Sequence, residues 1–587
     1  MPRKKIPKKL NRHFKRKKKE NVINLGSKNA KEQKKRRPLF WLENLFLFLI
    51  LVSTLFLRIY KVAEIPPSLN WDEISHAYNA YSLFKTGKDE WGIGWPLIFR
   101  AYGDYKLPLY IYLTAPLVGI FGISALTVRL ISILSGTGLT IMAYLITKKI
   151  WREKNIALLA ALMTAISPWS LFVSRAALEA NLAAFLFSLA IFFCLNWLED
   201  SRGSSLAWAV FFFGFSLYAY NSARILTPLF LLLIFGLAIK RKINPKILVV
   251  PFFLVIIAIL PLIGQFGNKS AVARFDLVSL VDQGMISQII LTRQESKLPL
   301  LLTRVVYNRP TFFLFAAVKN YLSNLSPLYL FFRGGSHYQF SLPDHELLYL
   351  VTAPFLLLGM IKAIFKGSTA ERLMVFWFWA AIIPSAITKD APHVLRTLLI
   401  LPSPMILTAL GLKVTGNFLK KGSFLGGKLL AGIFVFAVLF SFWRWWQDYQ
   451  TLYPQVYSWA WQYGYREAVL FIKQHYSEYD QIFITKRYGE PHEFLLAYYP
   501  WEPAKYQTDQ TKVWNYHANW YWIDGFDKFH FYNDWEFSNL KCRENCLLIA
   551  SPGNYPEGWS KIKTISFLDG KPAFEILEQN QKVISDQ

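Results

Sequence analysis

The chain has 587 residues, of which 53% are hydrophobic and only 18% charged, and it carries 48 Phe, 30 Tyr and 21 Trp. Soluble domains usually contain about 25% charged residues. The apolar residues gather into blocks of about 20 residues, the length that crosses a bilayer. The composition therefore indicates an integral membrane protein and excludes a disordered chain, a disulfide scaffold and a cytosolic enzyme.

The net charge of +28 is concentrated at the N-terminus, where residues 1–37 hold 17 Lys and Arg against Glu20 and Glu32. A basic tract of this kind can bind nucleic acid. Because a hydrophobic span follows directly, we instead predict a disordered cytoplasmic tail over residues 1–38 that contacts anionic lipid headgroups, and no nucleic-acid partner. The tail is too long for a cleaved signal peptide, and no small-residue cleavage site follows Tyr60.

Hydropathy predicts a transmembrane domain over residues 39–446 with about eleven spans, a cytoplasmic N-terminus and an outer C-terminus. The predicted spans are residues 39–60, 126–147, 156–172, 182–198, 206–220, 225–239, 247–263, 347–364, 373–387, 394–412 and 425–443. Residues 108–121 are apolar but short, so we expect them to lie in the interface. If they span instead, the basic cluster at residues 148–154 falls outside, against the positive-inside rule.

The soluble parts are predicted as two outer loops, residues 61–123 and 264–345, and an outer domain, residues 447–587. In this domain, helical spacing over residues 467–474 followed by an alternating pattern over residues 481–485 predicts an α/β or α+β fold. Cys542 and Cys546 lie here. An oxidising compartment favours a disulfide between them, whereas a placement on one helix gives poor disulfide geometry, so both states stay open.

The first outer loop contains an acidic pair, Asp72 and Glu73, at the start of a helical stripe. Asn70 and Glu73 have the spacing of a capping box, which gives Glu73 a structural explanation. Asp72 gains only a little from the helix dipole, and a carboxylate above the membrane surface can accept a proton from a hydroxyl. We predict catalytic roles for both, with Asp72 as the base.

Cations and aromatic residues follow on the same predicted face. Lys106 precedes an aromatic segment at headgroup depth, where it either meets a lipid phosphate or simply snorkels. Arg175 and Glu179 stand four residues apart, either as a helical ion pair or as part of a site at the mouth of two spans. The predicted set is Asp72, Glu73 and Glu179 for catalysis, Lys106, Arg175, Arg224, His393 and Arg396 for a donor phosphate, and Asp104, Tyr105, Tyr220 and His337 for the substrate.

A carboxylate among cations and aromatic rings at a membrane surface suits a substrate whose sugar is linked to a lipid phosphate. Nucleotide sugars are cytoplasmic, so an enzyme on the outer face needs a donor delivered on a lipid. The apolar spans would then hold the polyprenyl tail.

Several short motifs occur together in this topology. They are Asp72-Glu73, Lys106-Leu-Pro-Leu-Tyr110, Arg129-Leu130, Ser174-Arg175 with Glu179, Tyr220 to Arg224 and Pro392 to Arg396. Over roughly residues 39–443 the chain resembles the GT-C glycosyltransferases, specifically the dolichyl-phosphate-mannose protein mannosyltransferases and their bacterial aminoarabinose-transferase-like relatives. It departs from the family in Leu107, often a proline, and in Glu179, often an aspartate.

The resemblance implies transfer of a sugar from a polyprenyl-phosphate donor to an acceptor hydroxyl, with inversion, on the outer face of the cell membrane. It implies Asp72 as the base, and Lys106, Arg175 or Arg396 as partners of the leaving phosphate. The acceptor is a glycan, a lipid or a protein. Some GT-C enzymes use a divalent metal, but the sequence shows no compact ligand cluster, so we expect no metal and no cofactor.

The main alternative is a multi-pass transporter or a flippase for lipid-linked glycans. A proton-coupled transporter needs ionisable residues near the bilayer midplane and often has internal repeats. Between Asp200 and Asp276 the chain has no acidic residue, and it shows no repeat. A structural protein with a partner-binding outer domain would leave the loop carboxylates and cations unexplained.

Overall fold

The computed structural model describes residues 43–265, 278–422, 424–517, 520–540, 542 and 544–579. The predicted tail, residues 1–38, lies outside this part of the chain. The protein forms two compact units, Met1–Ser53 and Thr54–Gln587. Residues 43–53 of the first unit are helical, and the helix runs on to residue 59 in the second.

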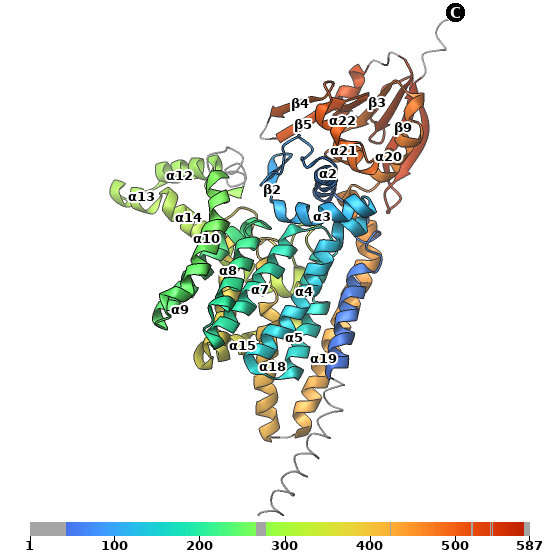
Figure 1. Ribbon diagram of the computed structural model, residues 1–587. Coiled ribbons are helices and arrows are strands. Elements are labelled where there is room, and N and C mark those ends of the chain that lie inside the picture. The colour runs from blue at the N-terminus through green and yellow to red at the C-terminus, as the bar shows by residue number, and fades with distance from the viewer. Residues whose placement is uncertain are drawn as a thin grey trace, which may run out of the picture. The chain divides into compact units, whose positions relative to one another are not determined.

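The second unit contains a bundle of apolar helices (Figure 1). They are α3 (Pro108–Phe121), α4 (Ala125–Trp151), α5 (Lys154–Ile166), α6 (Pro168–Val173), α7 (Glu179–Asp200), α8 (Gly203–Ser216), α9 (Asn221–Lys240), α10 (Pro245–Gln265), α15 (Ala353–Lys366), α16 (Thr369–Ala380), α17 (Ile383–Ala386), α18 (Ser403–Gly422) and α19 (Phe424–Tyr457). Among the described residues, six helices are long and apolar enough to cross a membrane. The chain is a multi-pass helical membrane protein, and the number of eleven spans stays a prediction.

Helix ends and small residues explain the packing of the bundle. Ser124 caps α4 by accepting the Thr127 N–H at 3.2 Å, which satisfies a free donor of the first turn. Between α15 and α18, a Cβ on Gly359 would lie 1.9 Å from the Leu407 carbonyl oxygen, and one on Gly411 would lie 1.8 Å from that of Phe355. These two glycines therefore allow the helix backbones to touch, as is common in membrane bundles.

The two predicted loops contain short elements. They are α2 (Trp71–Thr86), the hairpin of β1 (Phe99–Ala101) and β2 (Asp104–Lys106), and, in the second predicted loop, α12 (Gln283–Glu295), α13 (Leu300–Val306), α14 (Arg309–Asn324) and η1 (Tyr329–Arg333). The predicted interfacial segment is helix α3, which packs against α2. Figure 1 shows α3 lying across the end of the bundle below α2.

The C-terminal domain follows α19 and is a mixed sheet with helices. Its elements are α20 (Tyr465–Gln474), β3 (Gln481–Thr485), α21 (Pro491–Tyr498), α22 (Pro503–Thr508), β4 (Val513–His517), β5 (Trp520–Phe526), β6 (Phe529–Tyr532), β7 (Cys546–Ala550), β8 (Ser560–Ser566) and β9 (Pro572–Gln579). The strand order is β4-β5-β6-β3-β7-β9-β8, with β3 parallel to β6 and β7 and the other pairs antiparallel. The predicted helix and strand correspond to α20 and β3.

Cys542 and Cys546 form a disulfide. The alternative placement on a single helix was wrong, because Cys546 opens the extended strand β7.

The sheet domain packs directly on the first of the two predicted outer loops. Helix α2 contacts α21 and α22, and the Tyr78 hydroxyl donates to the Trp501 carbonyl at 3.3 Å. Tyr102 stacks on Trp520 with 5.6 Å between ring centroids. The helix that carries the predicted base is thus held between the bundle and the sheet domain.

Candidate active site

Asp72 and Lys106 form the centre of the site. The Asn70 side chain accepts the Glu73 N–H at 2.9 Å and Glu73 accepts the Asn70 N–H at 3.1 Å, so the predicted capping box is present and fixes the first turn of α2. The Lys106 ammonium, at the end of β2, lies 2.6 Å from Oδ1 of Asp72. Burial lowers the pKa of Lys106, but Asp72 and Glu179 raise it more, so this side chain stays charged.

His76 is a member of the site that the sequence analysis missed. It follows Asp72 by four residues on α2, is fully buried, and places Nε2 4.0 Å from Oε2 of Glu179. Neither ring nitrogen has a hydrogen-bond partner among the described residues. Burial and the charge of Lys106 lower the pKa of His76 to about 4, so the ring is neutral. The four-residue spacing from Asp72 was the available signal.

Glu73 is held in a buried ion pair. Nε and one terminal nitrogen of Arg129 each lie 2.8 Å from a Glu73 oxygen, and the Ala177 N–H donates to the same carboxylate at 2.7 Å. Both side chains are completely buried. These contacts favour a structural role for Glu73 over direct contact with substrate.

Arg175 is also occupied by the protein itself. Its guanidinium donates to the carbonyls of Leu57, Tyr60 and Ile65, the last two at 2.7 and 2.8 Å. Arg129 binds the carbonyls of Val62, Pro66 and Ser68 in the same way. Residues 57–68 are thereby fixed by two buried cations, and the contacts of Arg175 favour this structural role over phosphate binding.

Glu179 and Tyr220 lie beside the Asp72–Lys106 pair. Glu179 is the first residue of α7, and Tyr220 directly precedes the first residue of α9. Both raise the pKa of Lys106, though by less than Asp72 does. The N-terminal ends of three helices, α2, α7 and α9, therefore converge on one site.

Arg396 approaches from the loop before α18. It donates to Oγ1 of Thr388 at 3.0 Å and to the Lys389 carbonyl, while its own carbonyl accepts from Ser222 of α9 at 2.9 Å. The positive charge of Arg396 interacts electrostatically with the side chain of Tyr220. The loop thus brings a partly buried guanidinium next to the α9 cap.

His337 and His393 belong to the same region. His337 stacks on Phe340 with centroids 4.1 Å apart, and Phe340 lies 5.5 Å from the His393 ring. Burial lowers the pKa of His337, while Asp72 raises it by a smaller amount. His337 is therefore close enough to Asp72 to be affected by its charge.

Tyr105 and Asp104 are two further residues that were predicted to contact the substrate. The Tyr105 hydroxyl lies 3.4 Å from that of Tyr521 on β5, so it is directed to the sheet domain. The side chain of Asp104 lies outside the described part of the structure. Their roles stay predictions.

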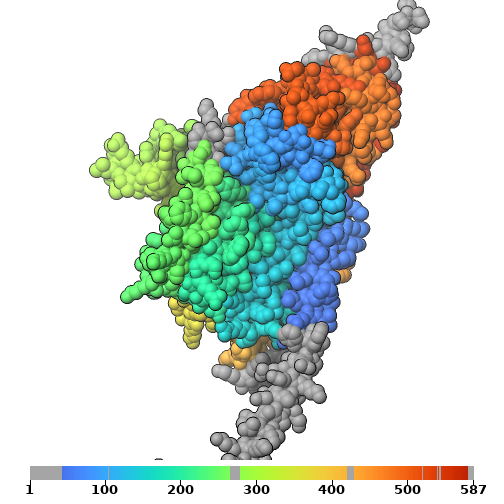
Figure 2. Space-filling model, in the orientation of Figure 1, coloured from blue at the N-terminus to red at the C-terminus, as the bar shows by residue number. Residues whose placement is uncertain are grey.

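Arg224 opens onto an apolar groove of about 620 Å³ between α8, α9 and α10. Figure 2 shows α9 and α10 in green along one side of the bundle. Leu217, Ala238 and Leu262 are among its lining residues. Arg224 is the one charged residue of this lining. Its Nε donates to the Leu217 carbonyl at 3.2 Å, and one terminal nitrogen has no partner among the described residues.

A family model matches part of the chain. Residues 106–264 match the model of dolichyl-phosphate-mannose-protein mannosyltransferase. The matched segment starts at Lys106 and includes Arg129, Glu179 and the groove helices. A comparison with curated proteins gave no match.

Solved structures of membrane glycosyltransferases resemble the chain weakly. The archaeal oligosaccharyltransferase AglB from Archaeoglobus fulgidus, in complex with an inhibitory peptide and a dolichol-phosphate, is 14% identical, with a TM-score of 0.45 over 78% of this chain and 64% of its own. ArnT from Cupriavidus metallidurans, bound to undecaprenyl phosphate, is 10% identical, with a TM-score of 0.42 over 93% and 99%. The S. cerevisiae Pmt1-Pmt2 complex is 17% identical, with a TM-score of 0.30 over 44% and 37%. The chain spans just under two thirds of the length of AglB.

Proposed function

We propose that the protein is a membrane glycosyltransferase that moves a sugar from a polyprenyl-phosphate donor to an acceptor hydroxyl on the outer face of the membrane. The observation that carries this proposal is the Asp72–Lys106 pair, 2.6 Å apart and beside Glu179, at the end of the bundle covered by the sheet domain. Together these residues supply a proton acceptor and a phosphate-binding cation at one place.

The donor phosphate would bind between Lys106 and Arg396. In the free protein Lys106 is paired with Asp72, and a lipid phosphate offers it a competing anion. Arg396 contacts Thr388, Lys389 and Asp390 of its own loop and is partly exposed, so a donor phosphate would compete with Asp390 for its guanidinium. Arg224 would attract the same headgroup at the mouth of the groove.

The polyprenyl tail would lie in the groove between α8, α9 and α10. Its lining is apolar apart from Arg224 and Thr227, and Arg224 is the one charged residue among those lining side chains, which matches a lipid with a charged head. Burying such a tail contributes about 0.8 kcal/mol per methylene group. The groove would then provide affinity and the residues above it would provide chemistry.

The acceptor hydroxyl would be deprotonated by Asp72. When the donor phosphate takes over Lys106, Asp72 loses its cation and becomes a better proton acceptor. The hydroxyl oxygen then forms the new bond to the anomeric carbon as the bond to the phosphate oxygen breaks, which inverts the configuration. The neutral His76 ring and the side chain of Glu179 would orient the acceptor or the sugar next to Asp72.

A flippase for lipid-linked glycans would also use the apolar groove. A flippase does not need a carboxylate that is paired with a lysine and lies beside a buried neutral histidine. This cluster and the family match over residues 106–264 both favour the transferase.

The test is transfer by the purified full-length protein in liposomes. A polyprenyl-phosphate sugar and a panel of glycan, lipid and peptide acceptors are supplied, and products are identified by mass spectrometry. We expect one donor-dependent glycosylated product with inverted anomeric configuration. Movement of the intact donor between leaflets with no product from any acceptor would identify a flippase instead.

A further inference from the structure

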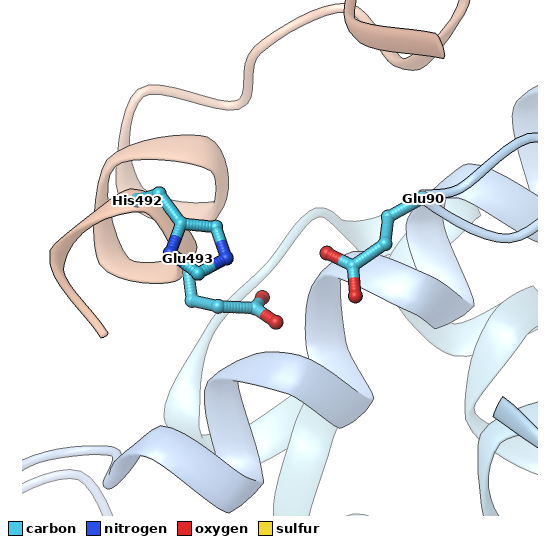
Figure 3. A group of neighbouring side chains, drawn as sticks. All are labelled: Glu90, His492 and Glu493. Atoms are coloured by element: carbon cyan, nitrogen blue, oxygen red, sulfur yellow. The ribbon is translucent and has the colours of Figure 1, made fainter. Parts of the chain in front are cut away.

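A second cluster of ionisable side chains lies away from Asp72, where the first outer loop meets the sheet domain. Glu90 comes from the loop after α2, and His492 and Glu493 come from the first turn of α21. One ligand atom from each lies within 4.8 Å of the others. Figure 3 shows the two carboxylates directed toward each other across the gap between loop and helix, with the imidazole beside them.

All three side chains are buried and incompletely satisfied. Their exposed fractions are 3% for Glu90, 4% for His492 and 1% for Glu493. Oε2 of Glu90, Oε2 of Glu493 and Nδ1 of His492 have no hydrogen-bond partner among the described residues. Buried polar atoms without partners are rare and costly, so two such carboxylates that share a gap with a buried imidazole indicate a missing ligand.

The partners that are present fix the cluster without completing it. Asn79 donates to Oε1 of Glu90 at 3.3 Å and accepts the Glu90 N–H at 3.2 Å. Nδ1 of His492 lies 3.5 Å from a Glu490 oxygen, without hydrogen-bond geometry. Glu490 itself accepts from the Trp520 indole. Glu90 is thus oriented by Asn79, and each of the three residues keeps one ligand atom within 4.8 Å of the others.

The charges of the cluster are also unbalanced. Two carboxylates face each other in a buried space, and Lys512, the cation that acts on Glu90, also interacts with the rings of Trp91 and Tyr506. A dipositive ion between the two carboxylates would balance both of their negative charges.

We propose that Glu90, His492 and Glu493 bind one divalent transition-metal ion of the zinc type. One imidazole and two carboxylates are ligands that Zn²⁺ takes in proteins, with a water as the fourth ligand. Mg²⁺ and Ca²⁺ prefer sites built from oxygen ligands, so an imidazole ligand favours a transition metal over either of them. Glu90 and the α21 pair are separated by about 400 residues in the sequence, so the ion would join the first outer loop to the sheet domain.

The role of the ion would be structural. It would hold α21 against the loop that follows α2, and α2 carries Asp72 in its first turn. Loss of the ion would loosen the packing of the sheet domain without removing any group from the Asp72 site. Metal binding is therefore measurable whether or not the protein transfers sugar.

The test uses the full-length protein in detergent, with any histidine tag removed. After treatment with a chelator and desalting, the protein is titrated with ZnCl₂, and bound metal is measured by inductively coupled plasma mass spectrometry alongside the thermal midpoint. We expect one Zn²⁺ per chain, a higher midpoint with zinc, weaker binding of Mn²⁺ and no effect of Mg²⁺. In Glu493→Gln and His492→Gln, zinc affinity should fall by about 100-fold or more.

Two further variants make the result decisive. His475→Gln removes an exposed histidine paired with Glu478 at 3.0 Å in the same domain, and it should leave zinc binding unchanged. Glu90→Gln keeps an oxygen for Asn79 and so preserves the fold while it removes one ligand. If the wild type binds no more zinc than Glu90→Gln, or if Glu90→Gln melts higher than the wild type with and without zinc, the carboxylates share a proton and the metal site is rejected.

Discussion

The Lys106 ammonium lies 2.6 Å from Oδ1 of Asp72, and the two side chains come from different elements, β2 and α2. The lysine is almost fully buried, whereas the aspartate keeps 30% of its side chain exposed. In the proposed mechanism the acceptor would therefore reach the carboxylate, and the neighbouring ammonium would meet the donor phosphate.

Replacement of Asp72 by asparagine removes the proton acceptor and keeps the shape of the side chain. We expect the transfer rate to fall by about 10²- to 10⁴-fold, the usual contribution of a general base, with unchanged expression and thermal midpoint. Glu64→Gln is the matched control, because Glu64 is an exposed carboxylate in the same outer loop. Full activity of Asp72→Asn would remove Asp72 from the role of base.

Replacement of Lys106 by methionine keeps the aliphatic stem and removes the charge. Because a charge-assisted hydrogen bond contributes about 1.5–3 kcal/mol, we expect the KM for the donor to rise by roughly 10- to 100-fold, with partial recovery in Lys106→Arg. Steady-state kinetics over a range of donor concentrations measures this. Lys61→Met, at an exposed lysine, serves as the control, and an unchanged KM for Lys106→Met would contradict phosphate binding here.

Val255 on α10 lines the apolar groove, whereas Val250 on the same helix is 59% exposed. A tryptophan at position 255 would fill part of the groove. We expect Val255→Trp to weaken use of a long polyprenyl donor much more than use of a donor with a short tail, and Val250→Trp to affect neither. Equal losses with both donors would show that the tail binds elsewhere.

The buried Glu73–Arg129 pair should be a large contributor to stability. Arg129→Met leaves an unpaired charge in a buried place, which costs about 3–5 kcal/mol. The exposed pair Lys61–Glu64, 3.7 Å apart, provides the comparison, and Lys61→Met should cost less than about 1 kcal/mol. Equilibrium unfolding in mixed detergents measures both free energies, and similar values for the two variants would contradict the structural role of Glu73.

The metal-free protein should lose stability as the pH rises. Burial raises the pKa of Glu90 and of Glu490 from 4.5 to about 7. Between pH 4.5 and about pH 7 the folded chain therefore binds more protons than the unfolded chain. The stability that these protonated groups contribute below pH 4.5 is lost progressively as the pH rises to about 7.

Thermal midpoints in chelator from pH 5 to 8 measure this slope. Glu90→Gln should flatten it, and zinc should reverse it because the metal binds the ionised carboxylates. A midpoint of the wild type that is constant or rises with pH in chelator would show that these carboxyl groups are ionised in the fold.

Local patterns in the sequence predicted much of the fold correctly. The Asn70–Glu73 spacing predicted the capping box, and the alternation over residues 481–485 predicted a strand. These features depend on neighbours along the chain, which a sequence displays directly. The helices that overlap the predicted spans follow from hydropathy for the same reason.

Residue roles that depend on packing were harder to predict. Arg175 was predicted to bind phosphate because cations at the mouths of spans often mark sites; its donors contact carbonyls of residues 57–65, and the phosphate role stays a prediction. His76 was missed because its neighbours Glu179 and Tyr110 come from other elements. Glu90 and His492 were missed because no local spacing connects them.

Arg129 and Arg175 hold residues 57–68 in place by hydrogen bonds. These bonds limit any attempt to change acceptor preference by exchanging the first predicted outer loop. Each guanidinium satisfies three main-chain carbonyls of that segment. The loop is therefore not an interchangeable module, since its shape is specified from the helical bundle below it. A chimaera that imports a foreign loop would need both arginines and a carbonyl path matched to them, or Asp72 would be displaced from Lys106.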